Sequence, residues 1–181
     1  ADSSMAGAFE SLLNINIERE IIKEAVNFVI NSFDNNLNNQ VLIQPMVKNV
    51  AMSGVIMTQV LNDGSPYHVV NFDDKTGLTD TVTSGSSINK TVYIYKGVDK
   101  KDFDSPLLLS VLNLIHDLQG AFPDIPLDIE FAIDKDMIMH LLQVRKITTI
   151  KNWNNNVSQQ VSNRMFFLKD YVERLMQKRP N

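Results

Sequence analysis

The sequence predicts an α+β fold, with a largely antiparallel sheet that is packed by helices on one side. Three observations support this fold class. Segments with helical periodicity and short β-rich runs are mixed along the chain, without the regular alternation of a doubly wound parallel sheet. A hairpin pattern at residues 127–148 supplies two neighbouring antiparallel strands. The length of 181 residues, 44% of them hydrophobic, is enough for a substantial core.

Three segments are predicted to be helical. Between residues 18 and 33, apolar residues recur at helical spacing on one face while charged residues occupy the other. A second helix begins at Ser105 and Pro106, because serine is a favoured N-cap and proline fits the first helical position. The last helix, at 157–178, is predicted to carry its apolar stripe on Val161, Leu168, Val172 and Leu175.

Four short runs ahead of the hairpin are predicted to be strands, since each is rich in strand-forming residues. The first, QVLIQPMV at 40–47, is interrupted by Pro45; the others lie at 53–60, 68–72 and 91–95. We expect residues 1–150 to form the main lobe and residues 151–181 to form a linker and a C-terminal helix.

The composition argues against several classes of partner. The net charge of -4 makes nucleic acid and anionic membrane surfaces unexpected partners, and no apolar run reaches the ~20 residues of a membrane span. Cysteine is absent, which excludes disulfides and favours a reducing compartment, so we expect a cytoplasmic protein. The first residues, ADSSMAGAF, lack a signal-peptide pattern and an initiator Met, so we expect a piece of a longer chain.

The hairpin carries polar residues on one face. Because side chains alternate along a strand, Asp128 and Glu130 share a face, and so do Gln143 and Arg145 on the returning strand. The turn residues Asp134-Lys135-Asp136 allow these two polar faces to coincide. The register stays open, with either Glu130 or Asp128 opposite Gln143.

Two interpretations of this polar face follow from the residues alone. Carboxylate and amide oxygens suit a hard cation such as Mg²⁺, and an arginine beside them suits a phosphate group, so the face is a candidate site for a metal–triphosphate. The other interpretation is a solvated sheet face with an Asp–Arg surface ion pair, which is worth ~0–1 kcal/mol.

Three segments carry a resemblance to a known family. The hairpin LDIEFAIDKDMIMHLLQVRKIT is similar to a DIEWAID…LLQxRPIT segment, VLIQPMVKNVAMSGVIMTQV at 41–60 to VxVQxMV…SGVxFT, and SSMAGAFESLLNI at 3–15 to SFAGQxxTxLNV. In this order they resemble the phosphoenolpyruvate synthase and pyruvate phosphate dikinase family. The resemblance covers residues 3–148, and the hairpin is its most specific part.

The resemblance implies an ATP-grasp fold, in which ATP lies between two α+β lobes, and makes this chain mostly the second lobe. By motif position, Glu130 and Gln143 would hold Mg²⁺ bound to ATP, and Arg145 would contact the transferring phosphates. The remaining matched positions are Asp128 beside the nucleotide, Gln44 at the adenine, and Gly7 and Ser11 in a loop over the phosphates.

The resemblance also implies a function, an ATP-dependent phosphotransferase whose remaining lobes belong to the rest of a longer chain. The small-molecule acceptor would be pyruvate or, because TDTVTSG at 79–85 departs from the family's GLGExVVSG, an amide such as glutamine, as in the capsule-associated branch. The alternative is a non-catalytic interaction or scaffold domain of the same ancestry. None of His68, His116 and His140 has the T-x-H-A setting of the family's phosphorylated histidine, so we expect all three to be structural.

Overall fold

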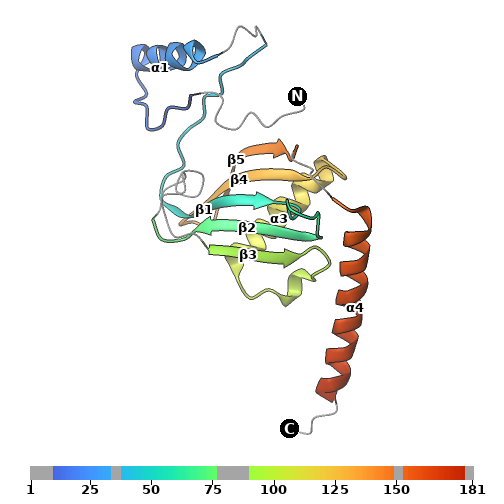
Figure 1. Cartoon of the computed structure of the whole chain (residues 1–181). Helices are drawn as coiled ribbons and strands as arrows, with labels where there is room; N and C mark the ends of the chain where they lie inside the picture. The colour runs from blue at the N-terminus through green and yellow to red at the C-terminus, as the bar shows by residue number, and fades with distance from the viewer. Residues whose placement is uncertain (1–9, 34–37, 77–89, 149–152, 178–181) are drawn as a thin grey trace. The chain divides into compact units, whose positions relative to one another are not determined.

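The structure is a computed structural model that describes residues 10–33, 38–76, 90–148 and 153–177 (Figure 1). The chain divides into two compact units, residues 1–48 and 49–181. The predicted α+β class is confirmed: within the described residues, a five-stranded antiparallel sheet is combined with three helices, including a C-terminal one.

The first unit contains the helix α1 (Arg19–Asn31), close to its predicted position. None of the described residues in this unit is buried. The predicted strand at 40–47 is wrong, because the chain there forms no strand. Leu42 and Ile43 are 77% and 65% exposed, and Pro45 has no N–H to offer a neighbouring strand. Strand-forming residues alone do not make a strand without a partner to pair with and a surface to cover.

The second unit contains the sheet, whose strands follow the order β3-β2-β1-β4-β5 (Figure 1). Every neighbouring pair is antiparallel. The three predicted strands ahead of the hairpin and the hairpin itself are therefore present. The strands are β1 (Val50–Met57), β2 (Tyr67–Asp73), β3 (Lys90–Tyr95), β4 (Leu127–Asp134) and β5 (Met139–Lys146).

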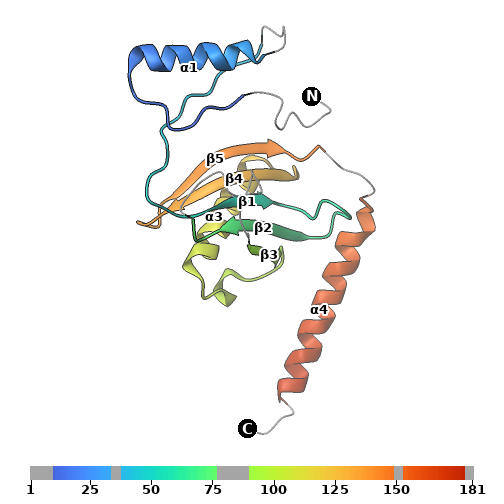
Figure 2. The ribbon, with the colours of Figure 1, turned by 60° about the vertical axis from the view of Figure 1, so that its left-hand side comes forward.

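The helix α3 (Pro106–Ala121) lies against one face of the sheet (Figures 1 and 2) and follows a short 3-10 turn at Lys100–Asp102. Its start is as predicted, since Ser105 Oγ accepts a hydrogen bond from the Leu108 N–H at 3.4 Å. The core lies between α3 and the sheet, and β4 is its centre because Ile129, Phe131 and Ile133 are fully buried. Val111 and Ile115 of α3 are buried against the same cluster.

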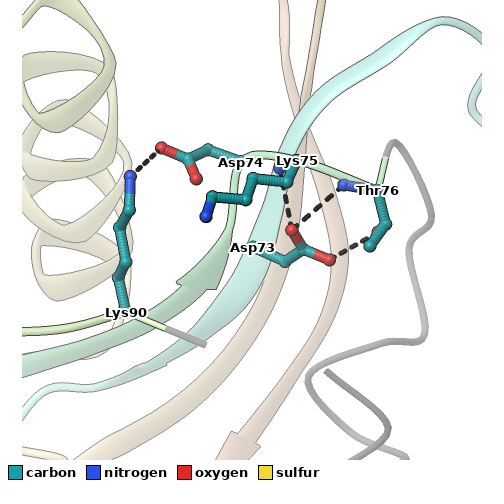
Figure 3. Close-up of polar contacts among 5 residues, drawn as sticks. All are labelled: Asp73, Asp74, Lys75, Thr76 and Lys90. Carbon is teal, nitrogen blue, oxygen red and sulfur yellow. Dashed lines mark hydrogen bonds and ion pairs between the residues drawn. The ribbon is translucent and has the colours of Figure 1, made fainter. Parts of the chain in front are cut away.

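The end of β2 is fixed by two carboxylates (Figure 3). Asp73 accepts hydrogen bonds from the backbone N–H groups of Lys75 and Thr76, at 2.8 and 3.2 Å, and from the Thr76 hydroxyl. Asp74 pairs with Lys90, the first residue of β3. The two strands are thus tied together on either side of residues 77–89, and the predicted TDTVTSG motif lies outside the described residues.

The C-terminal helix α4 (Asn155–Gln177) is anchored at its start. Trp153 donates its indole N–H to the Leu61 carbonyl at 2.7 Å, and Ser158 donates to the Gly64 carbonyl at 3.3 Å. Of the predicted apolar stripe, Val161 is partly buried, whereas Leu168, Val172 and Leu175 are 37%, 52% and 46% exposed. Among the described residues, no helix is long and apolar enough to cross a membrane.

Gly54 in the middle of β1 lies so close to β2 that no side chain fits. A Cβ at this position would lie 2.4 Å from the Asn71 carbonyl oxygen and 2.9 Å from Phe72 Cβ. Both atoms belong to a paired strand, Gly54 standing opposite Phe72, and the strand cannot move without losing ladder hydrogen bonds. The glycine is required by close approach of two backbones.

Replacing Gly54 by alanine is therefore expected to destabilise the fold by about 2 kcal/mol or more, by overpacking, and to lower Tm by several degrees. Thermal unfolding followed by circular dichroism measures the change. The matched control is Gly120→Ala in α3, where a Cβ meets nothing within 4 Å. That change should stabilise the helix by about 0.5–1 kcal/mol. Equal effects at both positions would contradict the steric argument.

His68 in β2 is buried on the core side of the sheet, with 5% of its surface exposed. Its Nδ1 has no hydrogen-bond partner in the structure. Burial and the nearby Lys96 ammonium lower the pKa of His68 to about 4, although a hydrogen bond to the Thr58 backbone opposes this shift. His68 is consequently neutral in the folded protein at pH 7, in line with the structural role expected from the sequence.

The lowered pKa of His68 predicts acid sensitivity. In the unfolded chain His68 binds a proton below pH 6.5. In the folded protein its pKa is about 4, so it binds the proton only below that pH. The contribution of His68 to the free energy of unfolding is fully present above pH 6.5. It decreases by on the order of 3 kcal/mol as the pH falls toward 4. Urea unfolding at several pH values should show a smaller loss for His68→Gln than for the wild type. His116→Asn, at an exposed position on α3, should keep the wild-type loss.

Candidate functional site

The candidate site lies on the sheet face opposite α3, which we call the outer face. Strand pairing aligns its side chains in two adjacent rows across the sheet. One row contains Thr91, Asn71, Val55, Glu130 and Gln143. The other contains Tyr93, Val69, Met57, Asp128 and Arg145. The β4–β5 half of this face is thus charged, and the β1–β3 half is mostly apolar or aromatic.

The register left open by the sequence has a single answer. Glu130 lies opposite Gln143, and Asp128 lies opposite Arg145. The pairing shifts by one residue after Glu130, so that Phe131 pairs with Leu141. This irregularity is a β-bulge, in which one strand carries an extra residue. All four predicted polar residues of the hairpin therefore belong to the same face.

The hairpin turn that sets this register is organised by Asp134. Its Oδ1 accepts hydrogen bonds from the backbone N–H groups of Asp136 and Ile138, both at 2.9 Å. Its Oδ2 lies 2.8 Å from His140 Nε2, and these contacts lower the pKa of Asp134. Met137 adopts a left-handed backbone conformation, with φ of 63°. His140 therefore supports the turn, which is a structural role.

The charged centre of the outer face is an arginine shared by two carboxylates. Arg145 Nη2 donates to Asp128 Oδ2 at 3.0 Å and to Glu130 Oε1 at 3.2 Å. The three side chains are 33%, 22% and 24% exposed, so the Asp–Arg pair of the alternative interpretation is present but partly shielded from solvent. Gln143 beside them is exposed.

The two carboxylates are not fully satisfied by Arg145. Asp128 Oδ1 is buried and has no hydrogen-bond partner in the structure. Burial raises the pKa of Glu130, the Arg145 guanidinium lowers it, and the Asp128 carboxylate raises it again. With formal charges of -1, -1 and +1, the cluster carries a net charge of -1. An unpartnered acceptor oxygen and a net negative charge are both features that a bound cation would compensate.

The protein ligands for a metal are few. Among the described residues, no three His, Cys, Asp or Glu side chains are grouped so as to hold a metal ion. Two carboxylates and an amide oxygen nevertheless fit Mg²⁺, because this ion commonly keeps several waters and takes the rest of its ligands from one or two carboxylates and substrate phosphates. Asp128, Glu130 and Gln143 therefore fit a metal held partly by its substrate.

The other residues matched by the resemblance lie in the first unit. Ser11 and Gln44 are both exposed there. Gly7 lies outside the described residues. The structure thus brings together the four hairpin residues, and the roles of Gly7, Ser11 and Gln44 stay predictions.

Sequence reasoning missed Asn71. This residue lies in the same row as Glu130, with Val55 of β1 between them, and its Oδ1 is buried without a hydrogen-bond partner. The alternation of HVVNF already places Asn71 on the face opposite Val70 and Phe72. Its alignment with Glu130 depends on two strand registers, which the sequence does not specify.

Two substitutions should move the pKa of Glu130 in opposite directions. Arg145→Met removes the charge that lowers it, so the pKa rises further; Asp128→Asn removes a charge that raises it, so the pKa falls. Carbon-detected NMR of the Glu130 carboxyl group during a pH titration measures both shifts. Lys146→Met, at the next position of β5, serves as the control and should leave this pKa close to that of the wild type. Shifts of the same sign in both variants would refute the shared-arginine geometry.

Comparisons with known proteins found no match to any family model, any curated protein or any solved structure. The resemblance to the phosphoenolpyruvate synthase and pyruvate phosphate dikinase family therefore stays a prediction.

Proposed function

We propose that the outer face binds Mg²⁺-ATP, and that this chain is the second ATP-grasp lobe of a Mg²⁺-dependent phosphotransferase. The observation that carries the proposal is the cluster of Arg145, Asp128 and Glu130, a guanidinium held between two partly buried carboxylates, one of which keeps an unpartnered oxygen. Phosphoryl transfer requires mainly positioning and charge stabilisation, and such groups provide both.

The charge of the cluster decides which form of the nucleotide fits. Its net charge of -1 repels a free triphosphate, and a single guanidinium already engaged with two carboxylates does not reverse that sign. A triphosphate that brings a divalent cation changes the balance, because the carboxylates then face the cation and Arg145 is released toward phosphate oxygens. Arginine suits this second role, since its planar fork matches phosphate geometry.

Each residue has a proposed part in this arrangement. Glu130 and Gln143, which lie opposite each other, would hold Mg²⁺ when it is bound, and the metal would supply charge neutralisation to the phosphates. Arg145 would bind the transferring phosphoryl group. Asp128 orients the guanidinium by its 3.0 Å hydrogen bond, and so acts on the phosphates through Arg145.

The acceptor would be a small molecule, either pyruvate or an amide such as glutamine in capsule biosynthesis. The proposal assigns acceptor binding to the remaining lobes of a longer chain. The first unit leaves apolar surface that such lobes would cover, since none of its described residues is buried and Ile17 is 95% exposed. A helix with no buried residue gains little stability from tertiary packing, so this unit needs a further surface.

A second candidate function is a non-catalytic interaction domain of the same ancestry. The observation that favours it is the exposed apolar surface of α4, where Phe166 is 79% and Met176 is 70% exposed. Apolar side chains grouped on one helix are typical of surfaces that contact another protein. In this case the outer face would bind no nucleotide.

The two candidates are separated by the response of the full-length protein to ATP. If the proposal holds, Mg²⁺-ATP at about 100 times its Kd stabilises the folded state by about 2.7 kcal/mol, and ATP with a chelator stabilises it much less. Differential scanning fluorimetry measures the change in Tm. Glu130→Gln keeps the shape of the side chain but removes its charge, and should abolish most of the Mg²⁺-dependent gain. Arg145→Met should lower the affinity for ATP by about tenfold or more.

The control for both variants is Lys146→Met, which removes an exposed charge from the same strand and should respond to Mg²⁺-ATP like the wild type. A full-length protein that is stabilised normally, and turns over ATP normally, with both Glu130 and Arg145 replaced would end the proposal. No response of the wild type to Mg²⁺-ATP would favour the interaction domain.

A further inference from the structure

A second polar site lies at one end of the sheet, and none of its residues belongs to the two rows of the outer face. It is a hollow of about 230 Å³ whose polar lining comes from Thr58, Gln59, Lys96, Gln119 and Asp124. Thr58 and Gln59 follow β1, Lys96 follows β3, and Gln119 belongs to the last turn of α3. Asp124 lies in the connection from α3 to β4. The hollow is smaller than the ~300–1,000 Å³ of most drug-sized ligand pockets, so it suits a small ligand.

Two opposite charges line this hollow without neutralising each other. Lys96 and Asp124 form no ion pair with any residue that the structure describes. Partial burial of its side chain lowers the pKa of Lys96, although the residue as a whole is exposed. An ammonium group in such surroundings gains from an anionic ligand more than a fully solvated one does.

The neutral groups of the hollow also keep hydrogen-bonding capacity. Thr58 is 1% exposed, and its Oγ1 accepts the Leu127 N–H at 2.8 Å, so it holds the wall of the hollow against β4. Gln59 donates its amide nitrogen to the Gly64 carbonyl, which leaves its Oε1 as an acceptor. These two bonds fix Thr58 and Gln59 in place, so the lining of the hollow contains an oriented amide acceptor in addition to its two charged residues.

His68, which does not line the hollow, adds no positive charge beside Lys96 at pH 7. It lies close enough to Lys96 for the ammonium charge to lower its pKa to about 4, so the ring is neutral at pH 7. Lys96 is therefore the one cationic residue among the described residues that line the hollow. The carboxyl end of α3, which contains Gln119, adds partial negative charge to that of Asp124, because unpaired helix carbonyls gather at that end.

We propose that this hollow binds a small zwitterion, an α-amino acid, with its carboxylate on Lys96 and its ammonium group near Asp124 and the end of α3. A simple anion would be repelled by Asp124, and a simple cation would be repelled by Lys96. A ligand that carries both charges can pair with both residues. The proposal does not rest on nucleotide binding, because none of its residues belongs to the outer face.

The test uses the backbone amide signals of Thr58, Gln59 and Lys96 in two-dimensional ¹⁵N NMR of the chain. Each common L-amino acid is titrated in turn, together with N-acetylalanine, which lacks the ammonium group, and alaninamide, which lacks the carboxylate. At least one free amino acid should shift these signals saturably, and neither analogue should. Lys96→Met and Asp124→Asn should each weaken binding by about tenfold or more.

The matched controls are Lys101→Met and Asp117→Asn, which remove the same charges at positions 89% and 81% exposed. Both variants should bind the amino acid like the wild type. Arg145→Met should also bind the amino acid normally, but it alone should lose affinity for ATP. The proposal is overturned if no free amino acid shifts these amides, or if alaninamide or N-acetylalanine shifts them equally. The wild-type titrations decide this even if a substituted protein does not fold.

Discussion

The structure depends on the alternation of side chains along β4. This strand lies between β1 and β5, so both of its edges are occupied by hydrogen bonds. One of its faces packs into the core, and the other carries the polar side chains. Ile129, Phe131 and Ile133 are fully buried beneath α3. Asp128 and Glu130, between them in sequence, are held on the outer face. A slip of one residue would bury both carboxylates in the core, so the apolar side fixes the position of the polar side.

The outer face joins two kinds of surface that suit different parts of one ligand. Its β4–β5 half presents charge, and its β1–β3 half presents Val69, Met57 and Tyr93, the last 62% exposed. The hollow lined by Lys96 and Asp124 adjoins the end of β1, because its lining residue Thr58 directly follows Met57, the last residue of that strand. Thr58 is hydrogen-bonded to Leu127 through both its backbone and its side chain. The same strand pair therefore supports both candidate sites.

The sequence predicted the helices, all five strands that the described residues form, and the shared face of the four polar hairpin residues. These features follow from local periodicity and from caps such as Ser105, which act over a few residues. The failures have a common cause. Residues 40–47 have strand-forming side chains but no neighbouring strand to pair with, and a local pattern does not reveal this. The register of β4 against β5 depends on a bulge after Glu130, which the sequence does not specify either. The importance of Asn71 and the hollow around Lys96 arises from contacts between segments distant in sequence, which a single sequence does not specify.

The pairing of Asp74 with Lys90 has a consequence for how this chain can vary. Because the ends of the segment between β2 and β3 are already held together, additional residues between them extend a closed loop, and the entropy of such a loop grows only with the logarithm of its length. Insertions, deletions and altered composition at 77–89 would leave the ladder between the two strands in register. Related chains could therefore diverge most at this place while keeping one sheet, and TDTVTSG at 79–85 lies within it.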